Sequence, residues 1–240
     1  MGKMRAEERL IVALDVDNIN RALELIDILA PVVEVFKVGI APFTGFGHNL
    51  LEELRFAGKK CFLDLKFHDI PNTVLNAARA AAARGVFMIN FHCLGGRKML
   101  EAAVKGAKEA GGDEEGKKPL LLGVTVLTSM GDEDLRAVGL SGVLRDRVID
   151  LAGLAADAGM DGVVASAQEA RDIKQRIGED FLVVTPGVRP EWAPGGDQKR
   201  ILTPKRAISE GADYIVVGRP IIEADDPASA ARKIIEEMGT

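Results

Sequence analysis

The chain has 240 residues, of which 47% are hydrophobic and 28% are charged, and its formal net charge is −5. These values fit one soluble globular domain with a large core, while the acidic balance and the single Trp and single Tyr argue against a nucleic-acid partner. Two cysteines are too few for a disulfide scaffold, and no apolar run reaches the roughly 18 residues of a membrane span. We therefore expect a cytoplasmic protein without a membrane partner.

Strand-like apolar runs alternate with helix-like runs along the whole chain. The predicted strands are residues 10–16, 34–40, 60–67, 86–93, 120–127, 162–166, 181–188 and 214–218. The predicted helices are residues 18–30, 48–57, 72–84, 97–110, 132–138, 143–158, 167–177, 204–210 and 228–238. Eight βα units in a chain of this length predict a (β/α)₈ TIM barrel, with residues 1–240 as a single domain.

A doubly wound open sheet is the alternative fold. Such a sheet usually has fewer strands, and in dinucleotide-binding proteins its first strand is followed by Gly-x-Gly-x-x-Gly. Here the first predicted strand is followed by Asp15-Val16-Asp17-Asn18, which contains no glycine. The barrel is therefore the favoured prediction.

Ionisable residues stand at or near the C-terminal ends of the first three predicted strands. Asp15 ends the first strand and Lys37 lies inside the second, whereas Asp64 and Lys66 share one face of the third because side chains alternate along a strand. Asp69 follows just beyond. Burying an ion costs on the order of several kcal/mol, so a strand that needed only stability would carry Val or Ile here. A structural ion pair would explain one such strand, but three together indicate one convergent polar site.

A phosphate site is expected at the same end of the barrel, after the seventh and eighth strands. Active sites of these barrels lie at the C-terminal ends of the strands, often with a phosphate site after strands seven and eight. The eighth predicted strand ends in Val217-Gly218-Arg219-Pro220. Gly218 lets backbone N–H groups approach an anion, and Arg219 supplies a guanidinium fork. Because Gly-Arg is also common in ordinary turns, only its place in the barrel makes phosphate binding the favoured interpretation.

Signatures of metal and nucleophile chemistry are missing from the sequence. No spacing of His, Cys and Glu suggests a zinc site, and no Gly-x-Ser-x-Gly elbow suggests a serine hydrolase. His68, beside the charged run, is expected to be structural or to support the site, and His92, at the end of the fourth predicted strand, is expected to be a hydrogen-bonded residue of the barrel. Cys61 and Cys93 lie in strand-like runs, where a free cysteine packs as a small hydrophobe.

These residues together resemble the orotidine 5′-phosphate decarboxylase family over nearly the whole chain. The matching segments are Ala13-Leu14-Asp15, Phe36-Lys37-Val38-Gly39, the run from Asp64 to Thr73, Thr125-Val126-Leu127-Thr128-Ser129, Thr185-Pro186-Gly187-Val188-Arg189, Asp197-Gln198 and Val217-Gly218-Arg219-Pro220. The Asp-x-Lys-x-x-Asp core is shared with a wider set of sugar-phosphate barrels, whereas Ile70-Pro71-Asn72-Thr73 and the Gln198 loop are more specific. The resemblance implies decarboxylation of orotidine 5′-monophosphate to uridine 5′-monophosphate and CO₂ in pyrimidine biosynthesis, with no metal or organic cofactor.

The resemblance also implies the roles of individual residues. It makes Lys37, Asp64, Lys66 and Asp69 a catalytic network of alternating charge, in which Lys66 donates a proton to C6. It supplies Asp69 from the neighbouring subunit of a homodimer whose active site lies at the interface. The implied substrate contacts are Asp15 and Thr73 at the ribose, Thr128 and Ser129 near the base, Arg189, Gln198, Gly218 and Arg219 at the phosphate, and Lys37, Asp64, Ile70 and Pro186 elsewhere on the nucleotide.

Two other hypotheses stay open on the sequence alone. One is a Mg²⁺-dependent sugar-phosphate barrel of the same suprafamily, such as a 3-keto-gulonate-phosphate decarboxylase or a hexulose-phosphate synthase. The other is a non-catalytic barrel that binds uridine monophosphate without turnover. A requirement for Mg²⁺ would favour the first, and binding without loss of substrate absorbance would favour the second.

Overall fold

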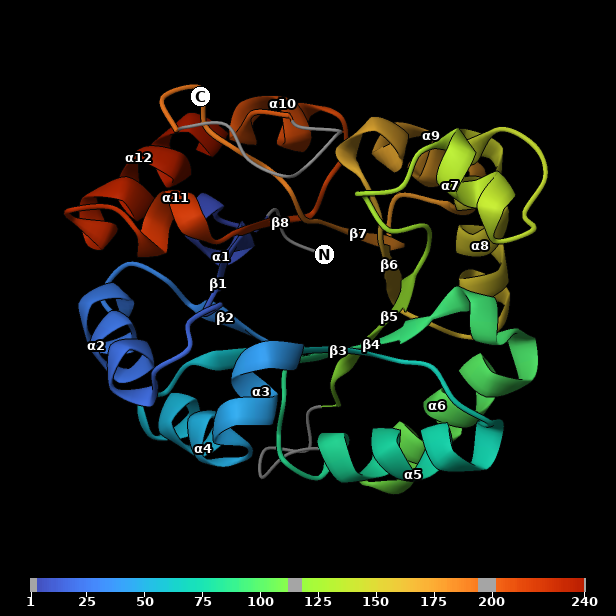
Figure 1. Cartoon of the computed structure of the whole chain (residues 1–240), viewed down its shortest axis with the longest axis horizontal. Coiled ribbons are helices and arrows are strands. Elements are labelled where there is room, and N and C mark those ends of the chain that lie inside the picture. The colour runs from blue at the N-terminus through green and yellow to red at the C-terminus, as the bar shows by residue number, and fades with distance from the viewer. Residues whose placement is uncertain (1–3, 112–117, 194–201, 240) are drawn as a thin grey trace.

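A closed barrel of eight parallel strands organises the molecule, in a computed structural model that describes residues 4–111, 118–193 and 202–239. Each strand pairs with the next along the chain, and β8 pairs with β1 to close the ring. Helices surround this ring on all sides (Figure 1). The prediction of a (β/α)₈ barrel is therefore confirmed.

The strands coincide with the eight predicted ones but mostly end earlier. Their bounds are β1 Leu10–Ala13, β2 Val35–Gly39, β3 Lys60–Phe67, β4 Met88–His92, β5 Leu120–Val124, β6 Gly162–Val164, β7 Leu182–Thr185 and β8 Tyr214–Val217. Only β3 has the predicted bounds. Some of the apolar residues beyond the other strand ends stay buried at the barrel rim, such as Leu14, Val126 and Val188, whereas Ile40 and Leu127 are exposed.

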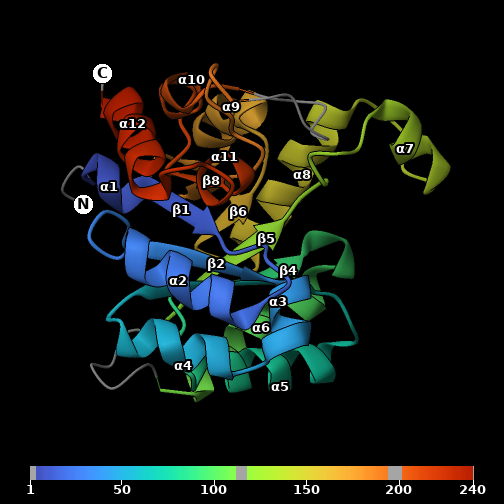
Figure 2. The ribbon, with the colours of Figure 1, turned by 60° about the vertical axis from the view of Figure 1, so that its left-hand side comes forward.

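The helices that cover the strands follow the predicted order. Their bounds are α2 Ile19–Leu29, α4 Asn49–Phe56, α5 Pro71–Ala82, α6 Arg97–Glu109, α7 Asp132–Ala137, α8 Leu144–Asp157, α9 Ala167–Ile177, α10 Pro204–Ser209 and α12 Pro227–Gly239. Four short elements were not among the predicted helices: α1 Ala6–Arg9, α3 Ile40–Phe46, η1 Cys93–Gly95 and α11 Arg219–Ile222. Figure 2 shows α7 standing away from the barrel wall.

Helix α3 was missed because its sequence carries helix-breaking residues. Pro42 and Gly45 both fall within its seven residues. Pro42, however, lies in the first turn, where a backbone N–H would have no partner inside the helix, so its missing donor costs little. The helix begins directly at the end of β2 and lies over the rim of the barrel (Figure 1).

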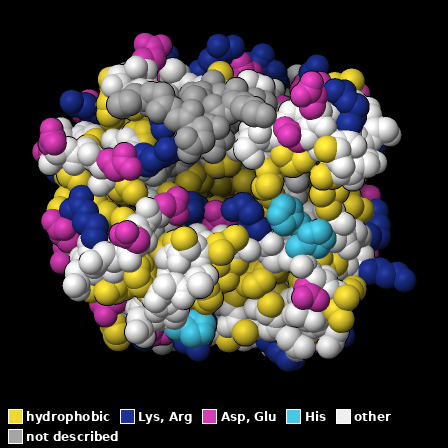
Figure 3. Space-filling model, in the orientation of Figure 1, with side chains coloured by type: hydrophobic (Ala, Val, Ile, Leu, Met, Phe, Trp, Pro, Cys, Tyr) yellow, Lys and Arg dark blue, Asp and Glu magenta, His cyan; other side chains and the backbone are white. Residues whose placement is uncertain are grey.

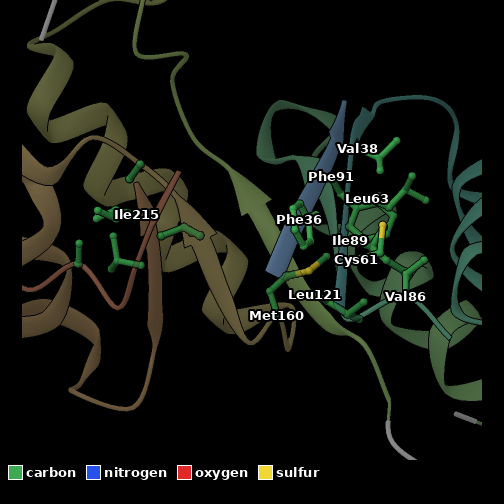
Figure 4. Packing of buried hydrophobic residues seen from close by; sticks show 14 of the residues in the cluster. Phe36, Val38, Cys61, Leu63, Val86, Ile89, Phe91, Leu121, Met160 and Ile215 are labelled. Carbon is green, nitrogen blue, oxygen red and sulfur yellow. The ribbon is translucent and has the colours of Figure 1, made fainter. Parts of the chain in front are cut away.

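Two apolar layers hold the barrel together. The outer layer lies between strands and helices, and Figure 4 shows Phe36, Leu63 and Ile89 packed within it. The inner layer fills the lumen with residues from alternate positions of the same strands, such as Val35, Phe62 and Met88. Because both faces of these parallel strands are buried, their sequences are nearly continuous apolar runs.

The two cysteines belong to the apolar layers, as predicted. Cys61 and Cys93 are both buried as free thiols, and burial raises the pKa of each to about 12. At neutral pH they therefore stay protonated and behave as small hydrophobes. None of the helices in the described ranges combines the length and apolar character that crossing a bilayer requires.

Candidate active site

The lumen of the barrel changes from apolar to charged at the C-terminal ends of the strands. The lumen is apolar at Val35, Phe62 and Met88. The next inward-facing residue on each of these strands is polar, and on β2 and β3 it is Lys37 and Asp64, which are 8% and 7% exposed. Figure 3 looks onto this end and shows acidic and basic side chains side by side in a central hollow, with histidine side chains at its edge. The alternation of side chains along β2 and β3 thus places charge inside the barrel, as the sequence predicted.

Four of the predicted residues form one chain of alternating charge. Nζ of Lys37 lies 3.0 Å from Oδ1 of Asp15 and 3.4 Å from Oδ2 of Asp64. The other oxygen of Asp64 accepts a hydrogen bond of 2.6 Å from Nζ of Lys66. Asp64 is therefore held between two ammonium groups, and its position compensates the cost of burying Lys37. Exposure rises from the Lys37 side chain at 11% to that of Lys66 at 29%, which leaves Lys66 open to the hollow.

A distortion of β3 turns Lys66 toward this cluster. The pairing of β3 with β4 shifts between Leu63 and Phe67, and Lys66 is the one non-glycine residue with positive φ, at 50°, in the described ranges. A left-handed conformation is strained for a residue with a Cβ and persists only where the surroundings hold it. The lysine thus departs from the regular pleat at the point where the chemistry is expected.

His68 and His92 lie next to Lys66 at the edge of the hollow. Their ring centroids are 5.4 Å apart, and burial, the neighbouring His68 and the Lys66 ammonium lower the pKa of His92. Nδ1 of His92 is buried and has no hydrogen-bond partner within the described residues. Among those residues no group of three or more His, Cys, Asp or Glu could hold a metal ion.

Arginines line a cavity of about 220 Å³ after β7 and β8. Arg189 and Arg219 both contribute to its wall, together with Trp192 and Glu223. Gly218 precedes α11, and a Cβ there would lie 3.4 Å from Cβ of Ala13, so this turn packs against the end of β1. The cavity and the charge cluster are thus joined through neighbouring strand ends, since β8 pairs with β1.

The structure distributes the remaining predicted residues around the same end of the barrel. Thr128 is buried and Ser129 exposed beyond the end of β5, whereas Pro186 follows β7 and is half-buried. Ile70 and Thr73 are exposed, at the N-cap and in the first turn of α5. Gln198 lies outside the described residues.

Asp69 stands apart from the charge cluster. It is exposed, and its Oδ1 accepts a hydrogen bond of 2.6 Å from the backbone N–H of Ile70. Within the described part of one chain it forms no salt bridge with Lys66. Three of the four predicted catalytic residues are therefore brought together here, and the fourth is not.

Sequence reasoning missed two residues of the cluster. Asn90, fully buried in β4, donates from Nδ2 to Oδ1 of Asp64 at 2.6 Å and accepts from the backbone N–H of Lys66 at 2.8 Å. Gly39 leaves room for the Lys37 ammonium, since a Cβ there would lie 2.9 Å from Nζ. A lone amide inside the apolar run Met88-Ile89-Asn90-Phe91 was the available signal for Asn90. Gly39 ends one of the segments that carry the family resemblance, but nothing in the sequence assigned it a role.

Comparisons with known proteins agree with this geometry. The family model described as "Orotidine 5'-phosphate decarboxylase / HUMPS family" matches residues 8–234. The chain is similar to curated orotidine 5′-phosphate decarboxylases. It is 48% identical to that of Saccharophagus degradans, over 97% of this chain and 95% of the relative. It is 49% identical to that of Heliobacterium modesticaldum, over 98% of this chain and 97% of the relative. The crystal structure of orotidine 5′-phosphate decarboxylase from Lactobacillus acidophilus superposes with a TM-score of 0.85 at 39% identity, over 97% of this chain and 100% of that one.

Proposed function

Because the chain belongs to the orotidine 5′-phosphate decarboxylase / HUMPS family, we propose that it converts orotidine 5′-phosphate to uridine 5′-phosphate and CO₂, with Lys66 as the proton donor and without a cofactor. The reaction, a carboxy-lyase step of pyrimidine biosynthesis, is the activity named for the curated relatives that cover nearly the whole chain. Residues 1–240 act as one domain in this proposal, and the compartment is the cytoplasm.

The alternating charge cluster is the observation that carries the proposal. Nζ of Lys66 is held 2.6 Å from Asp64 at the open end of the lumen, and Lys37 is held between Asp64 and Asp15. A structural ion pair would need only one cation. Two ammonium groups and a shared, buried carboxylate instead form a preorganised field whose free end is a proton donor.

The chemistry of the substrate requires such a field. Loss of CO₂ from C6 of the pyrimidine leaves an electron pair that the ring delocalises poorly. Without a cofactor as an electron sink, the protein must stabilise this carbanion with positive charge and then protonate it. The Lys66 ammonium supplies both, because it is a compact cation that can transfer one proton from any of its three N–H bonds. Asp64, which faces the departing carboxylate in this scheme, disfavours the bound substrate relative to the carbanion.

Substrate binding is assigned to the polar residues around the hollow. In the proposal Asp15 and Thr73 hold the ribose, and Thr128 and Ser129 contact the base. The phosphate occupies the cavity beside Arg189 and Arg219, with Gly218 and Gln198 as further contacts; Ile70 and Pro186 complete the substrate-binding set. These phosphate contacts are remote from C6, so their binding energy positions the reacting group rather than changing its chemistry.

The proposal completes each active site across a homodimer interface. Asp69, which stays outside the cluster of its own chain, is assigned to the neighbouring subunit's site. Supporting this, exposed apolar residues follow three successive strand ends beside the hollow: Ile40 at 56%, Ile70 at 67% and Leu94 at 47% exposure. Figure 3 shows hydrophobic side chains on the surface that surrounds the hollow. An exposed apolar surface of this kind, placed next to the site, suits a two-fold interface.

A spectrophotometric assay tests the activity and its independence from metal. Purified protein is incubated with orotidine 5′-phosphate, with and without EDTA, and the ultraviolet spectrum is followed. We expect equal turnover in both, and a loss of at least a hundredfold in kcat, about 2.8 kcal/mol, for Lys66→Ala. If EDTA abolishes activity and added Mg²⁺ restores it, the assignment moves to the Mg²⁺-dependent relatives. If the protein binds uridine 5′-phosphate but does not turn over the substrate, it is a non-catalytic binding protein.

Subunit mixing tests the shared site. Lys66→Ala and Asp69→Ala chains, each inactive in this proposal, are co-refolded so that heterodimers form. One site of each heterodimer receives both defects and the other receives none. Since half of randomly paired dimers are heterodimers, about a quarter of wild-type activity should return, an estimate that rests on two-fold symmetry. If confirmed heterodimers stay as inactive as the separate variants, Asp69 serves its own subunit.

A further inference from the structure

Asn90 is a buried amide in a wall that is otherwise apolar or charged. It lies in the middle of β4 with 0% exposure, and its side chain faces the lumen between Met88 and His92. A buried amide is unfavourable unless its donor and its acceptor both find partners. The substrate roles assigned above make no use of this residue.

The β3–β4 ladder is interrupted opposite Asn90. Leu63 pairs with Ile89, and the next pair is Phe67 with Phe91. Residues 64–66 of β3 therefore face the single residue Asn90, two more than a regular parallel ladder accommodates. Backbone groups of this bulge lose their strand partners and need others.

The side chain of Asn90 supplies one of the missing backbone partners and also bonds the Asp64 carboxylate. Its Oδ1 accepts from the backbone N–H of Lys66 at 2.8 Å, and its Nδ2 donates to Oδ1 of Asp64 at 2.6 Å. The orientation of the amide is fixed by these neighbours, because the N–H requires an acceptor and the carboxylate requires a donor. A carboxylate or an aliphatic side chain of similar size could satisfy one of the two groups or neither.

We propose that Asn90 is a positioning residue for the decarboxylation. It holds the backbone of Lys66 in its left-handed conformation and fixes the rotamer of Asp64, so that the Lys66 ammonium is presented to the hollow rather than along the strand. The same oxygen of Asp64 accepts from Asn90 and from Nζ of Lys66, which links both contacts in one unit. The inference rests on the proposed role of Lys66.

Two substitutions separate positioning from a general contribution to stability. Asn90→Leu keeps the volume and removes both contacts. Asn90→Asp keeps the acceptor for the Lys66 N–H but loses the donor to Asp64 at high pH, where two carboxylates would meet. When the pH falls, one proton shared between the two carboxylates restores the donor. Burial and the like charge favour this protonation in the variant, whereas the ammonium groups of Lys37 and Lys66 beside Asp64 oppose it.

The expected results differ between the variants. For Asn90→Leu, kcat falls at least about tenfold, as for the loss of a hydrogen bond to a charged group, while KM changes less than about threefold because the phosphate cavity is untouched. For Asn90→Asp, kcat is low at pH 8 and recovers by at least about threefold towards pH 5.5, relative to the wild type at each pH. Hydrogen exchange of the Lys66 N–H accelerates in Asn90→Leu and stays slow in Asn90→Asp.

A matched control removes a similar contact from the other end of the barrel. Asp161 accepts a hydrogen bond of 2.7 Å from the backbone N–H of Leu121, across two neighbouring strands. Asp161→Ala should lower the Tm yet leave kcat and the Lys66 exchange rate unchanged. This pattern distinguishes lost stability from lost positioning.

Several outcomes would overturn the inference. One is an Asn90→Leu enzyme that keeps kcat within threefold of the wild type while its Tm falls, since the amide would then be structural only. If Asn90→Leu does not fold, Asn90→Asp decides alone, and a pH profile parallel to that of the wild type refutes the role. A failure of the proposed role of Lys66 gives a different pattern. Lys66→Ala would then keep turnover, and the Lys66 N–H would still exchange faster in Asn90→Leu than in the wild type.

Discussion

A methyl group at Gly39 is the smallest change that reaches the charge cluster. A Cβ there would lie 2.9 Å from Nζ of Lys37 and 3.2 Å from Oδ1 of Asp15, both closer than ordinary van der Waals contact. Both atoms are ends of side chains, so Gly39→Ala displaces the side chains and leaves the backbone in place. The φ of −87° at this position is open to alanine, and no backbone strain is added.

The size of the effect follows from the contact that is lost. The Lys37–Asp15 hydrogen bond of 3.0 Å joins two charged groups, and such bonds contribute about 1.5–3 kcal/mol. Because the Asp15 side chain is 54% exposed, we take the lower end, about 1.5 kcal/mol, which corresponds to a loss of roughly tenfold in kcat/KM. The same loss in the folded state should lower the Tm by roughly 3–6 °C.

The assay compares Gly39→Ala with Gly45→Ala, in steady-state turnover of orotidine 5′-phosphate and in thermal unfolding. Gly45 lies in α3, and a Cβ there would meet nothing within 4 Å. Its variant should keep full activity and gain up to about 1 kcal/mol of stability from the higher helix propensity of alanine. Gly39→Ala with kcat/KM within twofold of the wild type would refute the reasoning, because the Lys37–Asp15 contact would then contribute nothing to turnover.

Three further predictions concern pH, stability and phosphate binding. Since burial lowers the pKa of His92, the unfolded chain takes up this proton first as the pH falls, and stability is lost below about pH 6.5. His92→Gln should therefore flatten the fall in Tm between pH 7 and pH 5. Lys174 donates to the Asp213 carboxylate at 2.7 Å at the far end of the barrel, so Lys174→Met should lower stability by about 3 kcal/mol, or roughly 6–12 °C in Tm, with kcat unchanged in the same assay. Arg219→Ala should raise KM for orotidine 5′-phosphate by about tenfold or more relative to phosphate-free orotidine, and equal losses for both substrates would show that Arg219 does not hold the phosphate.

The sequence by itself determined the family and the architecture. Apolar runs and helical periods recur eight times, and this local pattern is enough to specify a barrel because each βα unit buries the same kind of surfaces. The residues at strand ends were also readable. Asp15, Lys37, Asp64 and Lys66 stand out since charge in a buried strand is costly, and the structure brings these four together. The roles given to them stay predictions until the assays above are made.

Only the tertiary structure decided how those residues meet. The bulge in β3 depends on register against β4, which is a relation between strands that no local pattern encodes. The same holds for Asn90, whose amide bonds a backbone group that the interrupted pairing of β3 leaves without a strand partner. It also holds for Gly39, whose missing Cβ makes room for the Lys37 side chain two residues away. Sequence periodicity fixes which face a side chain takes, whereas contacts, register and available space arise only when the strands close into a ring.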